Sequence, residues 1–109
     1  MPTFEDFDAL DIRVGQITRV EDNPKARNPA YVITVDLGKE IGLKQSSAQF
    51  TVFYKPKDLI GRQVLCVTNF PSKRIAGVKS EILILGVYHG DGVVLIEPDR
   101  KVALGDRLG

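Results

Sequence analysis

The sequence predicts an all-β domain with short helices, in which five strands close into a small barrel with N- and C-terminal extensions. Apolar and polar side chains alternate through Tyr31–Leu37, a period of two that is typical of a half-buried strand. A glycine interrupts the alternation of the preceding strand pattern, and one short helix pattern falls among the later strands. A chain of 109 residues has room for one domain, 1–109, and for one core.

A short amphipathic helix is expected at the N-terminus. Thr3 followed by Asp6 has the spacing of a helix-capping pair, and apolar side chains then recur every third residue until the pattern ends near Asp11. The acidic start differs from the basic start of a signal peptide, and no apolar run approaches the roughly 18 residues of a membrane span. We therefore expect a cytoplasmic protein without membrane insertion. The recurring apolar residues are Phe4, Phe7 and Leu10.

The strand that follows is expected to bend at Gly15. Ile12 and Val14 occupy alternate positions, but the next apolar position is Ile17, one residue later than strict alternation requires. A glycine bulge absorbs such a one-residue shift. The pattern therefore predicts a β-bulge at Gly15.

Two apolar runs, Val64–Thr68 and Ile82–Val87, lack alternation and predict central strands. Cys66 lies within the first run and is the only cysteine, so we expect a buried, reduced thiol without a disulfide. The remaining expected elements are strands over 31–37, 41–50 and 93–97 and one helix over 54–61. A bent first strand and a helix before the fourth strand are the order of the oligonucleotide/oligosaccharide-binding (OB) fold.

Basic residues are concentrated in the middle of the chain. Residues 44–80 hold seven Lys or Arg side chains and one acid, a net charge of +6, whereas the whole chain has a formal charge of +1. Clustered cations attract polyanions and release counterions from phosphates. The segment therefore indicates a polyanionic partner, the alternative being that its charges are scattered over several solvated faces.

No constellation for catalysis, for a metal or for a nucleotide cofactor is recognisable. His89 is the only histidine, and Gly90–Gly92 has the composition of a hairpin turn rather than of a phosphate-binding loop. Three serines each lie near a lysine, but nothing supplies an oxyanion hole or a third orienting group. We expect neither an enzyme nor a bound cofactor.

Two polar segments carry side chains suited to phosphates and sugars. Lys and Arg supply charge, whereas Ser, Asn and Gln supply hydrogen bonds to backbone oxygens. Phe70 either stacks on an unpaired base or packs in the core before Pro71, and core packing is favoured. For Asn69, turn formation explains the residue as well as direct contact does. The candidate RNA-binding residues are Lys44, Ser46, Ser47, Asn69, Lys73, Arg74, Lys79 and Ser80.

Four stretches resemble the tRNA-binding domain family, which includes the C-terminal extension of methionyl-tRNA synthetase and the EMAP II cytokine. They are Asp11–Ile17, Ile41–Gln49, Tyr54–Pro56 and Asn69–Glu81, and the most specific parts are 44–49 and 74–81. Within the family the chain is most similar to the bacterial CsaA proteins, since Ile82-Leu83 follows Ser80-Glu81 where members built for tRNA alone carry Gly-Met. The resemblance implies an OB barrel, a homodimer and tRNA binding without catalysis.

The resemblance also implies an alternative function, that of an export-related chaperone which binds unfolded preproteins and the secretion motor. The candidate peptide-binding residues are Phe50, Phe70 and Arg74. For the homodimer, apolar residues outside the barrel strands are the candidate interface, unless they cap the barrel within one chain. These residues are Phe4, Phe7, Leu10, Val102 and Leu104.

Overall fold

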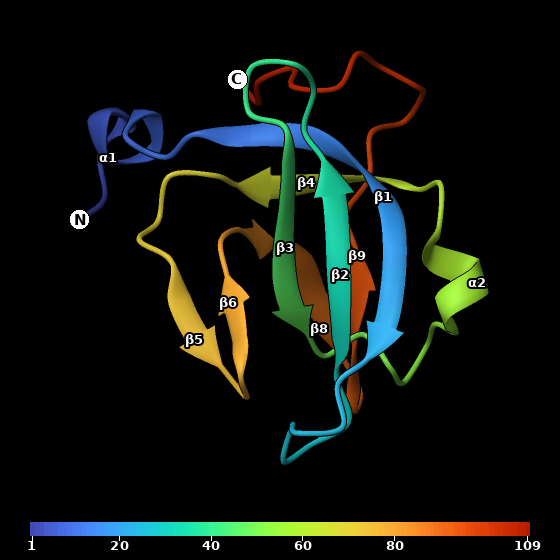
Figure 1. Ribbon diagram of the computed structural model, residues 1–109. Helices are drawn as coiled ribbons and strands as arrows, with labels where there is room; N and C mark the ends of the chain where they lie inside the picture. The colour runs from blue at the N-terminus through green and yellow to red at the C-terminus, as the bar shows by residue number, and fades with distance from the viewer.

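Strand pairing produces a nearly closed antiparallel barrel. The strands are β1 (Ile12–Asp22), β2 (Tyr31–Asp36), β3 (Leu43–Ala48), β4 (Gln63–Val67), β5 (Lys73–Ile75), β6 (Val78–Ser80), β7 (Leu83–Ile84), β8 (Gly86–His89) and β9 (Gly92–Leu95), and the helices are α1 (Phe4–Asp8) and α2 (Pro56–Leu59). The computed structural model describes residues 1–109, and its main sheet has the order β3-β2-β1-β4-β7 (Figure 1). Two hairpins, β5–β6 and β8–β9, complete the β structure. The predicted OB-type, mostly β fold is confirmed.

The alternation of β2 places its apolar side chains in the core. Ile33 and Val35 are fully buried, whereas the intervening Thr34 is half-buried. Leu59 of α2 and Val64 of β4 are fully buried in the same cluster. The strand predicted over 31–37 and the helix predicted over 54–61 are therefore confirmed, and each contributes to one shared core.

The predicted bulge at Gly15 is wrong. The register of β1 against β2 shifts between Ile17 and Arg19, so Thr18 is the extra residue. Gly15 is needed for a different reason, because a Cβ at this position would lie 2.8 Å from Cδ2 of the buried Leu37. The glycine lets two chain segments approach closely, and a shifted apolar pattern cannot by itself locate the bulged residue.

The apolar run Ile82–Val87 is not one central strand, so this prediction is also wrong. The run divides into β7, which pairs with two residues of β4, and β8, which belongs to the separate β8–β9 hairpin. Leu83 and Val87 are 46% and 52% exposed. Loss of alternation arises here because apolar side chains remain on the surface, rather than because both faces are buried.

Helix α1 has the predicted cap but little contact with the core. The Asp6 amide donates to the Thr3 hydroxyl at 3.3 Å, and the Thr3 amide donates to the Asp6 carboxylate at 2.8 Å. The helix ends at Asp8, earlier than the predicted end near Asp11, and none of its residues is buried. Neither helix has the length and apolarity that crossing a membrane requires.

Polar contacts hold the turn after α1 against the barrel. Asn69 Nδ2 donates to the Ala9 carbonyl at 2.9 Å, and Asn69 Oδ1 accepts from the Asp11 amide at 3.0 Å. The Asp11 carboxylate accepts from Arg13 Nε at 2.8 Å and from the Thr68 hydroxyl at 3.0 Å. The hydrogen bond from Arg13 lowers the pKa of Asp11, so the carboxylate is charged at neutral pH.

The C-terminal segment packs on its own barrel. The Gln63 side chain donates to the Val102 carbonyl at 2.7 Å and accepts from the Val102 amide at 3.0 Å. Val102 and Leu104 are half-buried. This placement favours the capping interpretation for these two residues over a role in a subunit interface.

Cys66 is buried in β4 as a free thiol, as predicted. Burial raises its pKa to about 12 because the thiolate would lose its hydration. The sulfur is therefore protonated at neutral pH and is shielded from reagents in solution.

Candidate nucleic-acid interface

The β5–β6 hairpin carries three of the candidate cations. Its turn, Ala76-Gly77, has positive φ at both positions, 49° and 82°, as in a type I′ turn. This hairpin was not predicted from the sequence, although the β-branched Ile75 and Val78 on either side of a turn glycine are a signal for it. The cross-strand pairs are Lys73 with Ser80, Arg74 with Lys79, and Ile75 with Val78.

The hairpin presents different side chains on its two faces. Paired residues share a face, and successive pairs alternate between faces. Arg74 and Lys79 therefore lie on one face, whereas Lys73 and Ser80 lie on the other. On the face of Ser80 the hairpin is attached to β3, so Arg74 and Lys79 are left exposed to solvent.

Ser46 and Ser80 attach the hairpin to the barrel. Their hydroxyl oxygens lie 3.2 Å apart, and the Ser47 amide donates to Ser80 Oγ at 3.3 Å. Both serine side chains are buried. The two hydroxyls are engaged with each other, and this contact positions β6 on β3. Ser47 is half-buried and stays a candidate for direct contact.

Gln45 strengthens the same junction. The Gln45 side chain donates through Nε2 to the Lys79 carbonyl at 3.2 Å, and the Gln45 backbone carbonyl accepts from the Glu81 amide at 2.9 Å. Glu81 in turn lies 3.7 Å from Lys44 Nζ. Lys44 is thereby partly neutralised, whereas Lys73, Arg74 and Lys79 form no ion pair.

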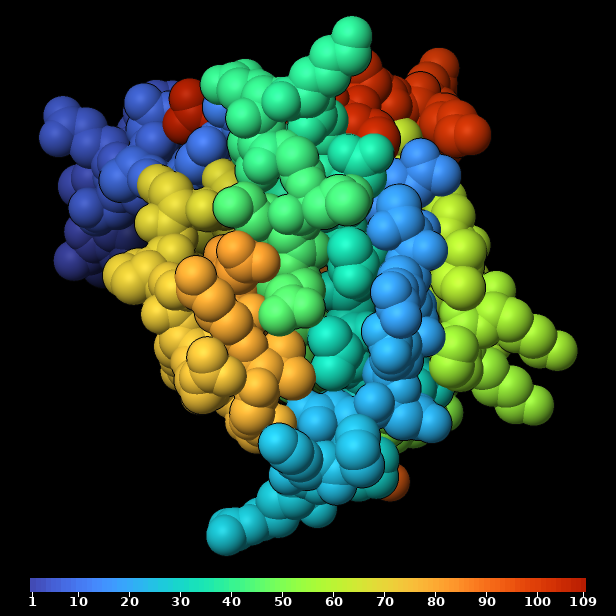
Figure 2. Space-filling model, viewed as in Figure 1, coloured from blue at the N-terminus to red at the C-terminus, as the bar shows by residue number.

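The β1–β2 loop (residues 23–30) adds two cations that the sequence analysis did not select. Lys25 and Arg27 are exposed and form no ion pair. The loop lies directly against the tip of the β5–β6 hairpin (Figure 2), where Asn23 Nδ2 donates to the Ala76 carbonyl at 3.4 Å. Charge counting did not select these cations, because residues 1–43 have a net negative charge. The two Asn-Pro pairs that flank them are a sequence signal for an exposed loop.

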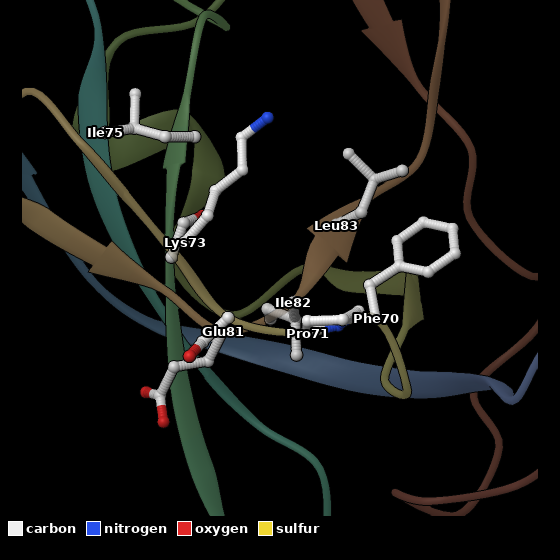
Figure 3. A pocket seen from close by; sticks show the side chains of 9 residues that line it. Phe70, Pro71, Lys73, Ile75, Glu81, Ile82 and Leu83 are labelled. Carbon is white, nitrogen blue, oxygen red and sulfur yellow. The ribbon is translucent and has the colours of Figure 1, made fainter.

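A hollow of about 540 Å³ opens on the Lys73 side of the hairpin. Phe70 and Leu83 lie on one side of it, and Lys73 and Ile75 on the other (Figure 3). The Glu81 carboxylate points away from Phe70 and Leu83 in the same view. The lining is mostly apolar, so this face differs in character from the Arg74 face.

The three candidate peptide-binding residues do not share a surface. Phe50 is buried in the core at 4% exposure, so little of its side chain is accessible to a ligand. Phe70 is 46% exposed at the hollow, and the favoured prediction of core packing is wrong for it. Arg74 lies on the opposite face of the hairpin. The Asn69 side chain makes its two hydrogen bonds to the turn after α1, so turn formation accounts for this residue.

Comparison with known proteins agrees with this geometry. The chain is 47% identical to the chaperone CsaA of Bacillus anthracis, with a TM-score of 0.94 over 100% of this chain and 99% of that chain. It is 45% identical to the CsaA chaperone protein of Picrophilus torridus, with a TM-score of 0.94 and 100% coverage of both chains. The predicted resemblance to the CsaA proteins is confirmed.

A methionine–tRNA ligase of Pyrococcus horikoshii is 40% identical over 105 residues, which are 96% of this chain and 14% of the ligase. The chain thus spans only a small part of these larger relatives. A family model described as "Putative tRNA binding domain" matches residues 12–107. The match covers the barrel, the β1–β2 loop and the β5–β6 hairpin. The chain belongs to the tRNA-binding domain family.

Proposed function

We propose that this protein binds structured RNA, in particular tRNA, and catalyses no reaction on it. The observation that carries the proposal is the basic surface formed by Lys25, Arg74 and Lys79, exposed cations without carboxylate partners at adjoining loops of an OB barrel. Uncompensated cations repel one another, and a polyanion relieves that repulsion. Membership of the tRNA-binding domain family supports the choice of tRNA. With tRNA as the ligand, we propose a cytoplasmic location.

Contacts to the sugar-phosphate backbone of the RNA suffice to recognise a structured RNA. A-form RNA hides its major-groove base edges but exposes phosphates and 2′-hydroxyl groups. Arg74 and Lys79 would neutralise phosphates, and Ser47 would donate to a backbone oxygen. Lys73 faces the hollow and Lys44 is paired with Glu81, so we assign these two lysines smaller contributions.

A salt series tests the proposal. With one phosphate neutralised by each cation of the basic surface, log Kd rises with log salt with a slope of about 2.7, and affinity falls about 40-fold between 50 and 200 mM. Fluorescence anisotropy with labelled tRNA measures both quantities. Absence of binding at 50 mM salt would refute the proposed function, and a flat salt dependence would refute its electrostatic basis.

A second candidate function is that of a chaperone that holds extended preproteins and meets the secretion motor. The hollow beside Phe70, Ile75 and Leu83 supports it, since a mostly apolar cavity of about 540 Å³ suits one or two apolar side chains. The CsaA proteins of known structure are described as chaperones. This hollow and the basic surface lie on opposite faces of one hairpin.

Because the two faces are separate, we expect peptide and tRNA to bind at the same time. An apolar extended peptide should bind with a negative heat-capacity change and little dependence on salt, unlike tRNA. Calorimetric titration of the peptide into tRNA-saturated protein should give a Kd within about twofold of that for free protein, whereas Leu83→Asp should abolish peptide binding alone. Loss of peptide binding in the presence of tRNA would indicate one shared site.

We also propose that the chain forms a homodimer through α1. Phe4 and Phe7 are 77% and 39% exposed, with ring centroids 6.4 Å apart. Two aromatic rings on a helix that buries none of its residues form a natural self-complementary patch, with Leu10 beside them. The half-buried Val102 and Leu104 would contribute less.

Phe7→Asp is expected to convert a dimer into a monomer at micromolar concentration, because a carboxylate would be desolvated in the interface. Sedimentation velocity measures the change, and circular dichroism checks that the barrel is intact. Leu43→Asp, at an exposed apolar residue of β3, is the control and should leave the dimer unchanged. A wild-type species of only 12.0 kDa would rule out the dimer.

A further inference from the structure

Two Asn-Pro pairs lie in the β1–β2 loop, but their asparagines have different environments. Asn23 is buried, and its Oδ1 accepts from the Lys25 amide at 3.1 Å while its Nδ2 donates to the Ala76 carbonyl at 3.4 Å. Its backbone amide donates to the Ala30 carbonyl at 3.1 Å. Asn28 is exposed and its side chain makes no hydrogen bond. Asn23 is therefore the residue that ties this loop to the β5–β6 hairpin.

The Asn23 hydrogen bonds bring Lys25 to the turn of the β5–β6 hairpin, where Arg74 also lies. A Cβ built on Gly77 would lie 3.0 Å from Cδ and 3.6 Å from Nζ of Lys25, so the lysine side chain lies over the hairpin turn. Arg74 Nη1 donates to the Gly77 carbonyl at 3.1 Å. Lys25 thus lies beside Gly77, to whose carbonyl Arg74 donates, and neither cation has a carboxylate partner.

This convergence is electrostatically unfavourable in the free protein. Like charges close together repel, and the repulsion is offset only by an anion placed between or beside them. A loop lysine that is free to move would also lose conformational freedom on binding, which weakens affinity. A side chain that holds the lysine in place beforehand removes that loss.

We propose that Asn23 is a positioning residue for RNA binding, which holds Lys25 beside Arg74 so that the β1–β2 loop and the β5–β6 hairpin act as one phosphate-binding surface. The inference rests on the proposed RNA-binding function. Asn23 itself does not touch the ligand, because its side chain is buried and both of its polar atoms are engaged. Its effect on affinity therefore passes through Lys25.

A double-mutant cycle tests the assignment. Lys25→Ala should weaken tRNA binding about eightfold at 0.1 M salt and lower the salt slope by about 0.9, since one phosphate contact is lost. Asn23→Ser keeps an acceptor for the Lys25 amide but cannot reach the Ala76 carbonyl, and it should weaken binding about threefold or more with a shallower slope. The double variant should bind no more than about twofold more weakly than Lys25→Ala alone.

The matched control is Asn28→Ser, the same substitution before the other proline of the loop, which should leave affinity unchanged. Unaltered affinity and slope in Asn23→Ser, with Lys25→Ala still weakened, would overturn the positioning role and leave the proposed function intact. Fully multiplicative losses in the double variant would show that Asn23 acts independently of Lys25. Failure of the wild-type protein to bind tRNA would overturn the function and this inference together.

A second variant approaches the contact from the hairpin and serves if Asn23→Ser does not fold. Gly77→Ala would place a methyl group against the Lys25 side chain and strain a turn residue with φ of +82°. It should weaken tRNA binding about threefold or more when Lys25 is present, and clearly less in the Lys25→Ala background. An equal loss in both backgrounds would contradict the placement of Lys25 by this contact.

Discussion

Replacing Arg74 and Lys79 together by alanine is expected to weaken tRNA binding about 60-fold at 0.1 M salt and to lower the salt slope by about 1.8. The two side chains form one cross-strand pair on the solvent face of the β5–β6 hairpin, and neither is engaged by an acid. Loss of both therefore removes two phosphate contacts without leaving an unpaired carboxylate. Anisotropy titrations at four salt concentrations measure affinity and slope together.

The control has the same change of charge at a different place. Lys39 and Lys101 are exposed and form no ion pair, and they lie outside the basic surface of Lys25, Arg74 and Lys79. Lys39→Ala with Lys101→Ala should change affinity less than about threefold, because only distant, screened charges are lost. Equal losses in both double variants would mean that net charge alone drives binding and that the hairpin is no specific site.

Gly15→Ala is expected to lower the free energy of unfolding by about 1–3 kcal/mol, the cost of overpacking a core without space for a methyl group. Leu37, whose Cδ2 would lie 2.8 Å from the new Cβ, is fully buried and cannot move aside without disturbing its neighbours. Urea denaturation measures the change, and the slope of the transition should stay constant.

Gly42→Ala is the control that distinguishes a steric clash of the added methyl group from strain of the backbone. Gly42 has φ of +82°, but nothing lies within 4 Å of a Cβ built on it. This variant should lose about 1–2 kcal/mol, from the left-handed backbone alone. A neutral Gly15→Ala variant would show that β1 and the end of β2 can separate at little cost, contrary to the close approach in the structure.

Local patterns in the sequence were sufficient for the elements whose form depends on nearby residues. The alternation through Tyr31–Leu37 identified β2, because each side chain's burial follows from its place in a period of two. The Thr3 and Asp6 pair identified the start of α1. The basic middle segment also indicated a polyanionic partner, since charge is a property of composition.

Which side of the molecule each residue faces was decided only by tertiary structure. Ser46 and Ser47 are neighbours in the chain, yet one is buried against Ser80 and the other borders solvent, because β6 packs on one side of β3. Phe50 and Phe70 have the same side chain, but only the first has core atoms around it. Chain patterns carry no information on which distant segment will cover a given face.

The membership of the basic surface shows the same division between sequence and tertiary structure. The sequence by itself determined the barrel class, the family and the charge of the hairpin segment. The packing of residue 23 on residue 76, which are far apart in sequence, determined that Lys25 belongs with Arg74. The physical reason is that a phosphate-binding surface depends on distances between cations, and those distances follow from chain closure across the whole barrel rather than from spacing along the chain.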